Sequence, residues 1–187
     1  MNRSENLISV LTEDHRDFQQ LLAELGYLAD FDRLRRSVAE LMIAEMVRHA
    51  VAEETYVYPV ARARLPQGRL IVEQEIAGHE QIERILRDLG RPDLNAAEFS
   101  FHLSRLEAES HPHTQAEEDR LFPLLARHLS EEELVDLGRK AVEAKEKASI
   151  RRYLADPDSS LRDRIVASGT TLVERVRAYL RTGAYPL

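Results

Sequence analysis

Apolar residues recur at every third or fourth position along almost the whole chain, which is the spacing of one face of an α-helix. Glycine, proline and acidic residues interrupt this pattern, most clearly at 65–68 and 156–158. The pattern predicts six helices, with approximate ranges 4–29, 33–63, 69–89, 95–128, 130–155 and 160–181. Ser4, Asn95 and Ser130 stand where helix-capping side chains are expected, and the last two have a glutamate three residues on.

The predicted elements indicate the fold class. No segment alternates in the way a strand does, so we expect an all-α protein. Four long helices with short links are typical of an up-down-up-down bundle, here at residues 1–129. Residues 130–187 are expected to add two C-terminal helices, either packed on the bundle or projecting from it.

Composition narrows the chemistry and the partners. The 187 residues include no cysteine, which excludes disulfides, cysteine-ligated zinc, iron–sulfur clusters and thiol catalysis. The net charge is −7 and basic residues are interspersed with acidic ones, so we expect no nucleic-acid partner. No apolar run approaches the ~20 residues of a membrane span. The N-terminal segment also lacks an apolar signal core, so we expect a cytoplasmic protein with no membrane partner.

An internal repeat relates the two halves of the predicted bundle. A shift of 64 residues superposes polar residues as well as leucines and prolines. Because each half spans two predicted helices, the repeat indicates two copies of one helical hairpin, related by a pseudo-twofold axis. The superposed polar and proline pairs are His15 with His79, His49 with His113, Glu53 with Glu117, Glu45 with Glu109, and Pro59 with Pro123.

The repeated polar residues have the donor types of a metal site. In each half a histidine and a glutamate stand four residues apart on one helix face, as His49 and Glu53 do. His15 and His79 lie within apolar stripes, so their imidazoles are expected to face the bundle interior. Burying unpartnered polar groups is costly. Four imidazoles and two carboxylates in one core therefore predict two metal ions, with each carboxylate able to bridge both.

The donor types also limit the choice of metal. Nitrogen and oxygen donors without sulfur suit iron or manganese, and they suit zinc somewhat less. Ferritin-like di-iron proteins carry a Glu-x-x-His motif, and no histidine of this chain has a glutamate three residues before it. A ferritin-like site is therefore disfavoured.

The order His, His-x-x-x-Glu, His, His-x-x-x-Glu over residues 7–129 resembles the hemerythrin-like (HHE) family, as do the stretches EDHRDFQQLL and GHEQIERIL. The resemblance implies a four-helix bundle around a non-haem di-iron centre, with two Fe ions joined by an oxo or hydroxo bridge. Manganese or zinc is a weaker alternative. The resemblance further implies binding of, or reaction with, oxygen, peroxide or nitric oxide. The implied ligands are His15, His49, Glu53, His79, His113 and Glu117.

One position departs from the oxygen-carrying members of that family. They carry a further histidine one turn before the ligand of the third helix, and this chain has Glu75 there. Either Glu75 is an additional carboxylate ligand, or the nearby iron keeps an open position. Both alternatives favour a reactive or sensing centre over a reversible oxygen store. Glu75 could also be an ordinary exposed helix residue.

Three more residues are candidates for the surroundings of the ligands. Tyr56 lies two turns after His49, where it would donate a hydrogen bond to a bound oxygen species or simply pack. Glu45 and Glu109 lie one turn before their histidines, where they would orient the imidazoles or remain solvated. The other three histidines, at 102, 111 and 128, are not expected to be ligands, and the repeated prolines predict a helix that bends or ends just past the site.

The function stays open between two hypotheses. No acid, base or nucleophile stands out beyond the ligand set, so any enzymatic reaction with peroxide or nitric oxide would be centred on the metal. Alternatively, the protein is an oxygen, iron or redox sensor that signals through its C-terminal helices to a protein partner that the sequence does not identify. A metal-free structural bundle is a third possibility, but it would leave six polar groups in its core.

Overall fold

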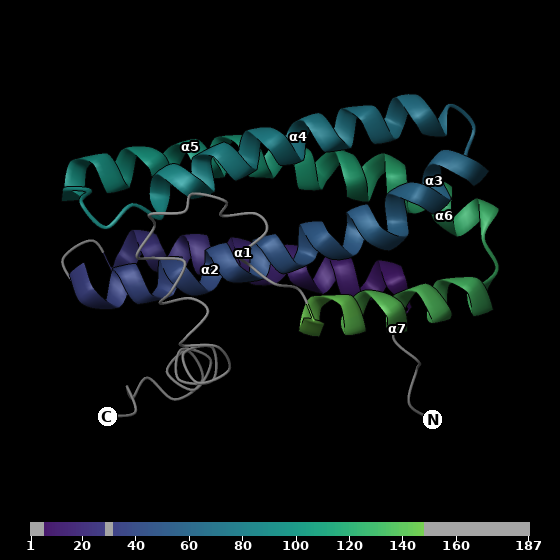
Figure 1. Ribbon diagram of the computed structural model, residues 1–187, viewed down its shortest axis with the longest axis horizontal. Coiled ribbons are helices and arrows are strands. Elements are labelled where there is room, and N and C mark those ends of the chain that lie inside the picture. Colours follow the sequence, from purple (N-terminus) through teal and green to yellow (C-terminus); the bar gives the residue numbers. More distant parts are fainter. Residues whose placement is uncertain (1–5, 29–31, 148–187) are drawn as a thin grey trace.

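The structure is a computed structural model that describes residues 6–28 and 32–147 (Figure 1). Within these ranges every regular element is helical, which confirms the prediction of an all-α fold. The α-helices are α1 (Leu7–Tyr27), α2 (Asp32–Ala52), α3 (Tyr58–Arg64), α4 (Gly68–Leu89), α5 (Ala96–Ala116), α6 (Phe122–His128) and α7 (Glu131–Lys147). Two short π-helical segments, η1 (Glu53–Val57) and η2 (Glu117–Leu121), join α2 to α3 and α5 to α6.

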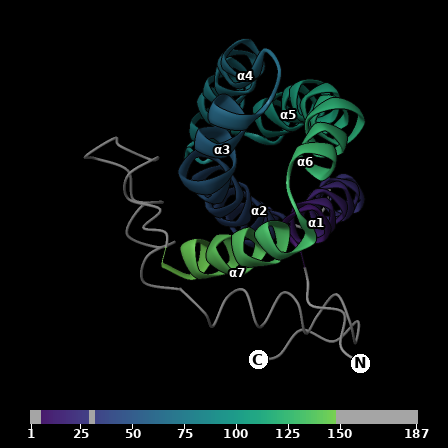
Figure 2. The same ribbon diagram turned by 90° about the vertical axis from the view of Figure 1, so that its right-hand side faces the viewer.

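The elements form two antiparallel hairpins. The first hairpin pairs α1 with the rod α2–η1–α3, and the second pairs α4 with the rod α5–η2–α6 (Figure 1). The sequence predicts one long helix for each rod with a bend or an end near its proline, and each rod contains a π-helical turn just before that proline, at the same place of the repeat. Viewed along the bundle, the four rods surround a common interior (Figure 2).

Side-chain caps fix where several helices begin. The Asn95 side chain accepts hydrogen bonds from the backbone of α5, and the Glu98 carboxylate accepts one from the Asn95 N–H, which confirms the predicted capping box. Ser130 and Glu133 make the same reciprocal pair at the start of α7. At α1 the cap is Asn6, whose side chain accepts from the Ser9 N–H at 3.0 Å, while the predicted cap Ser4 lies outside the described residues.

The apolar core consists of two clusters with a polar layer between them. Along α1, Leu7 and Leu11 belong to one cluster, and Phe18 and Leu25 belong to the other. His15 stands between these two pairs and is only 1% exposed. The bundle therefore holds polar side chains at mid-height, sealed at both ends by apolar packing.

The C-terminal part of the chain begins on the bundle. Helix α7 lies against α1, α2 and η1 on the outside of the first hairpin (Figure 2). Its Leu134, Leu137 and Ala141 join the same apolar cluster as Leu7 of α1. The described part of the fifth predicted helix is thus packed on the bundle, while the sixth predicted helix, at 160–181, lies outside the described residues. Among the described helices none is long and apolar enough to cross a membrane.

Candidate metal centre

The π-helical segments start at the two repeated glutamates. In each segment a backbone N–H donates to the carbonyl five residues earlier, from Tyr58 to Glu53 and from Phe122 to Glu117. A proline follows at the next position, and proline both lacks an N–H and crowds the carbonyl four residues back. The wider turn accommodates the proline, so the rod continues past the site as α3 or α6, and the predicted helix end does not occur there.

The six predicted ligand residues come together in the polar layer. They form two groups that share both glutamates, and within each group one donor atom per residue lies within 4.8 Å of all the others. Both glutamates are 0% exposed. The first group is His15, His49, Glu53 and Glu117, and the second group is Glu53, His79, His113 and Glu117.

In the first group the Nε2 atoms of both histidines point inward. Nε2 of His15 lies 3.3 Å from Nε2 of His49 and 3.3 Å from Oε2 of Glu117. Nε2 of His49 lies 3.1 Å from Oε2 of Glu53, its partner one turn along the helix. Atoms of these types converging on one point are the donors that a divalent cation takes from proteins.

The second group repeats this arrangement in the other hairpin. Nε2 of His79 lies 3.2 Å from Oε2 of Glu53, and Nε2 of His113 lies 3.6 Å from Oε1 of Glu117. Glu53 Oε2 is thus close to a histidine of each hairpin, and Glu117 likewise approaches both His15 and His113. This is the placement that a carboxylate bridging two ions requires.

The protein alone does not satisfy this cluster. Both carboxylate oxygens of Glu53, Oε2 of Glu117 and Nε2 of His113 are buried without a hydrogen-bond partner. Leaving a buried polar atom unpartnered costs ~1–3 kcal/mol, and more for a charged group. Cations at the two convergence points would satisfy all four atoms, so the residues present fit a pair of metal ions.

The pKa values describe a site that lacks positive charge. Burial alone would lower the pKa of His49, but the attraction of Glu53 and a hydrogen bond to Asp14 raise it to about 10. Burial likewise opposes protonation of His79, yet the adjacent carboxylates of Glu53 and Glu54 raise its pKa to about 9. Without metal, these two imidazoles keep protons that balance the buried carboxylates, and metal ions would replace those protons.

The two carboxylates themselves respond in opposite directions. Burial and the negative charge of Glu53 raise the pKa of Glu117. Burial would also raise the pKa of Glu53, but the neighbouring His49 and His79 hold it well below its usual range. Two carboxylates this close do not both stay ionised without a compensating charge.

The outward-facing nitrogens of two histidines bind glutamates from the opposite hairpin. Nδ1 of His15 donates to Oε1 of Glu118 at 2.7 Å, and Nδ1 of His79 donates to Oε1 of Glu54 at 3.1 Å. Such bonds fix the ring orientation and direct Nε2 toward a metal. Glu54 and Glu118 are equivalent in the repeat. The sequence did not single them out as site residues, although a Glu-Glu pair occurs at the same place in both halves.

The remaining two histidines are supported unequally. Nδ1 of His49 donates to Oδ2 of Asp14 at 3.0 Å. The position equivalent to Asp14 in the second half is Gly78, which has no side chain to offer. There Glu75, one turn earlier, places Oε2 3.3 Å from Nδ1 of His113. Glu75 therefore supports an imidazole from behind and does not belong to either group of converging donors.

A tyrosine enters the cluster, but it is Tyr58 and not the predicted Tyr56. The Tyr58 hydroxyl lies 3.0 Å from Nε2 of His79 and donates to Oε1 of Glu117 at 3.4 Å. Tyr56 is half-buried against the neighbouring apolar cluster. The π-helical turn explains the difference, because it holds one more residue per hydrogen-bonded turn and so rotates the residue five positions after Glu53 onto the ligand face.

Glu45 and Glu109, predicted to orient the imidazoles or to remain solvated, have different surroundings. Glu45 forms an ion pair with Arg48 at 2.9 Å, and Glu109 is exposed. The three histidines not expected to be ligands belong to neither group of converging donors. His102 lies 3.9 Å from Asp88, His111 is exposed, and His128 donates to the backbone carbonyl of Leu124.

A small apolar cavity adjoins the cluster. It measures about 40 Å³ and reaches His49, His79 and His113. A hollow of about 330 Å³ lies beside His15 between α1 and α5. Three residues line both spaces, namely Phe18, Ser110 and Thr114.

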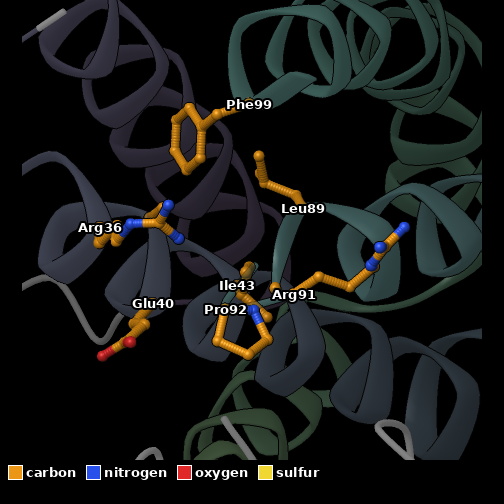
Figure 3. A pocket seen from close by; sticks show the side chains of 9 residues that line it. Arg36, Glu40, Ile43, Leu89, Arg91, Pro92 and Phe99 are labelled. Atoms are coloured by element: carbon orange, nitrogen blue, oxygen red, sulfur yellow. The ribbon is translucent and has the colours of Figure 1, made fainter. Parts of the chain in front are cut away.

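A separate hollow lies near the link between α4 and α5. It measures about 50 Å³, and Figure 3 shows Arg36 and Arg91 on opposite sides of it. Arg36 donates to the carbonyl of Leu94 and Arg91 to the carboxylate of Asp93, so both guanidinium groups are already engaged. Its lining contains no histidine, and it does not extend the metal cluster.

Comparison with known proteins agrees with this geometry. The sequence pattern of the hemerythrin HHE cation-binding domain matches residues 6–125. An uncharacterized hemerythrin-like protein of Schizosaccharomyces pombe is 28% identical over 127 residues, and the match covers 67% of this chain and 62% of that protein. The chain thus corresponds to less than two thirds of that relative's length. No solved structure matches significantly.

The matched region takes in both hairpins except the last residues of α6. It contains all six converging residues and both π-helical segments. The chain belongs to the hemerythrin HHE cation-binding domain family.

Proposed function

We propose that this chain is a non-haem di-iron protein that binds or reacts with oxygen, peroxide or nitric oxide. The observation that supports the proposal is the set of unpartnered buried donor atoms on Glu53, Glu117 and His113. These atoms converge with the other ligand candidates on two points that share both glutamates. Without a bound cation, burial of these donor atoms would carry a large desolvation cost.

The donor set favours iron among the available metals. Imidazole and carboxylate donors without sulfur suit iron and manganese, whereas structural zinc sites usually include cysteine. Two histidines and two shared glutamates per ion leave coordination positions unfilled at an octahedral ion. Iron bound there would supply electron exchange with a small oxidant or diatomic ligand.

The protein's own residues would orient the ligands and restrict access. Carboxylates behind the imidazoles, such as Glu54 and Glu118, hold each ring with Nε2 facing inward. The adjoining cavity of about 40 Å³ admits a molecule the size of one or two waters, which suits a diatomic molecule or peroxide. Its lining is mainly apolar, so larger polar substrates would be excluded.

A sensor is the second candidate function, and one contact favours it. Helix α7 packs on α1, α2 and η1, which carry three of the proposed ligands. Iron loading would then change how firmly α7 and the chain beyond it are held. In either role we propose a cytoplasmic protein. Turnover of peroxide or nitric oxide would distinguish an enzyme from a sensor.

Metal analysis of the purified chain tests the proposal. We expect two irons per chain and a near-ultraviolet absorption band from the bridged ferric pair. Glu53→Ala and Glu117→Ala should each abolish the band, because each removes a carboxylate shared by both positions. Glu109→Ala is the matched control, since this exposed glutamate lies on the same rod and should leave the band unchanged.

Three results would count against the proposal. A chain that takes up no iron, manganese or zinc would instead be a metal-free structural bundle. A chain that prefers zinc under competition would not carry the redox chemistry. A band that survives in both glutamate variants would show that the two carboxylates do not bridge.

A further inference from the structure

The side chain of Lys145 connects helix α7 to the surroundings of the metal cluster. Lys145, in the last described turn of α7, forms an ion pair with Oδ1 of Asp14 on α1. The other oxygen of the same carboxylate, Oδ2, accepts from Nδ1 of His49 at 3.0 Å. One carboxylate thus joins a cation of α7 to a proposed metal ligand of α2.

This chain of contacts is shielded from solvent. The side chain of Lys145 is 18% exposed, that of Asp14 is 12% exposed and that of His49 is 6% exposed. Charges in such surroundings interact more strongly than surface pairs, and removing one partner leaves the other buried without compensation. Lys145 therefore helps to fix the position of the Asp14 carboxylate.

The contact exists in only one half of the repeat. Gly78 occupies the position equivalent to Asp14, so the second hairpin has no carboxylate at that position. Helix α7 packs on the first hairpin and begins after residue 125, where the match to the family ends. The link is therefore an addition to the repeated scaffold and not part of its symmetry.

We propose that Lys145 is a positioning residue for the first metal position and that it couples metal occupancy to the docking of α7. Lys145 holds Asp14, Asp14 holds the His49 ring, and the ring presents Nε2 to the metal. Coupling of this kind is reciprocal, so metal bound at Nε2 of His49 stabilises the docked α7. The inference rests on the proposed metal site and adds a route by which its occupancy reaches the C-terminal part of the chain.

Ferrous iron added anaerobically, in competition with a chromophoric chelator, tests the first half of the proposal on the full chain. Removing an orienting partner of a ligand usually lowers metal affinity ~10–100-fold, which is the effect expected for Asp14→Asn. Lys145→Met acts one step further away, so we expect a loss of about tenfold or less at one of the two sites. Lys145→Arg keeps the cation and should restore most of the affinity.

The matched control is Lys140→Met. Lys140 lies on the same helix and its ion pair with Asp136 is on the surface, without a path to the cluster. A double-mutant cycle shows whether Lys145 acts through Asp14, because Lys145→Met should then have no further effect in the Asp14→Asn background. Circular dichroism and thermal melting establish that each variant is folded.

Hydrogen exchange tests the second half. Iron loading should slow exchange of the backbone amides of α7 in the wild-type chain, and this slowing should shrink in Lys145→Met but not in Lys140→Met. Equal iron affinity in Lys145→Met and wild type, or equal losses in both lysine variants, would overturn the inference. If the wild-type chain takes up two irons and either of these results is found, only the inference about Lys145 fails. If the wild-type chain takes up no metal, the proposed function itself fails.

Discussion

Replacing Gly78 with alanine should disturb the geometry of the cluster while changing the stability of the fold only slightly. A Cβ atom at this position would lie 2.8 Å from Nδ1 of His113, whereas ordinary contact begins at 3.4 Å. Restoring ordinary contact by movement of the His113 ring would displace it by about 0.6 Å, the difference between those two distances. A functional site tolerates displacements of only ~0.5 Å, so the ring would leave its position at the second metal.

The two energetic effects on the fold nearly cancel. Alanine in a helix gains ~1 kcal/mol over glycine, and overpacking costs ~1–3 kcal/mol. We therefore expect Gly78→Ala to change the free energy of unfolding by no more than ~2 kcal/mol. Iron affinity at the second position should instead fall ~10–100-fold, because the ring loses its alignment and its contact with Glu75.

Chelator competition and thermal melting of the same samples measure both quantities. The control is Gly26→Ala in α1, because a Cβ atom there meets nothing within 4 Å. Gly26→Ala should bind iron as the wild type does, with stability unchanged or raised by up to ~1 kcal/mol. If Gly78→Ala takes up both irons with wild-type affinity, the assignment of His113 to the metal cluster is wrong.

Three further outcomes follow from the same geometry. Tyr58→Phe should alter the iron absorption spectrum while the chain still takes up two irons, because the Tyr58 hydroxyl contacts His79 and Glu117. Tyr56→Phe is the control and should leave the spectrum unchanged. Glu118→Ala should weaken iron binding ~10–100-fold, because the Glu118 carboxylate orients the His15 ring. Asp119→Ala, at the exposed neighbouring position, should have no effect. Equal losses in the two variants would show that the contact between Glu118 and His15 does not orient the ring. The pKa values of His49 and His79 in the metal-free protein are raised from 6.5 to about 10 and about 9, so their stabilising contribution is complete below 6.5 and is lost as pH rises through those values. Urea unfolding of the metal-free protein should therefore show lower stability at alkaline than at neutral pH, and iron uptake at neutral pH should release protons, as calorimetry in two buffers of different ionisation enthalpy measures.

The repeat is the feature that made the cluster predictable from sequence. A shift of 64 residues aligns three pairs of donors, and alignment in two hairpins places them on one axis of the bundle. The structure brings those six residues together because the fold obeys the same pseudo-symmetry. Helical periodicity and the capping pairs Asn95–Glu98 and Ser130–Glu133 likewise depend on local rules that the sequence displays directly.

The π-helical turns were not predictable from that periodicity. The spacing of an ideal α-helix puts Tyr56 near the helix face that carries His49 and Glu53. The proline after each segment was the available signal, since a turn that must avoid proline's missing N–H can widen by one residue. Reading Pro59 as a widened turn, and not as a helix end, would have selected Tyr58.

The carboxylates behind the imidazoles could not be assigned for a different reason. Glu54 and Glu118 support histidines of the opposite hairpin, and no spacing within one helix encodes such a contact. Asp14 and Glu75 serve equivalent histidines from positions that are not equivalent in the repeat. These assignments depend on the distance between rods, which only the packed structure provides.

The differences between the halves make the two metal positions inequivalent. Tyr58 corresponds to Phe122, whose ring stacks on His15 at 5.7 Å between centroids, so a hydroxyl approaches one position and an apolar ring backs the other. Asp14 corresponds to Gly78, so only the first position has a carboxylate at this place, and that carboxylate connects it to α7. Identical ligands in unequal surroundings give ions of unequal affinity and reactivity, since orienting bonds and local polarity set both. A duplicated hairpin therefore supplies the proposed ligand cage, and the unduplicated residues around it would determine how each bound ion behaves.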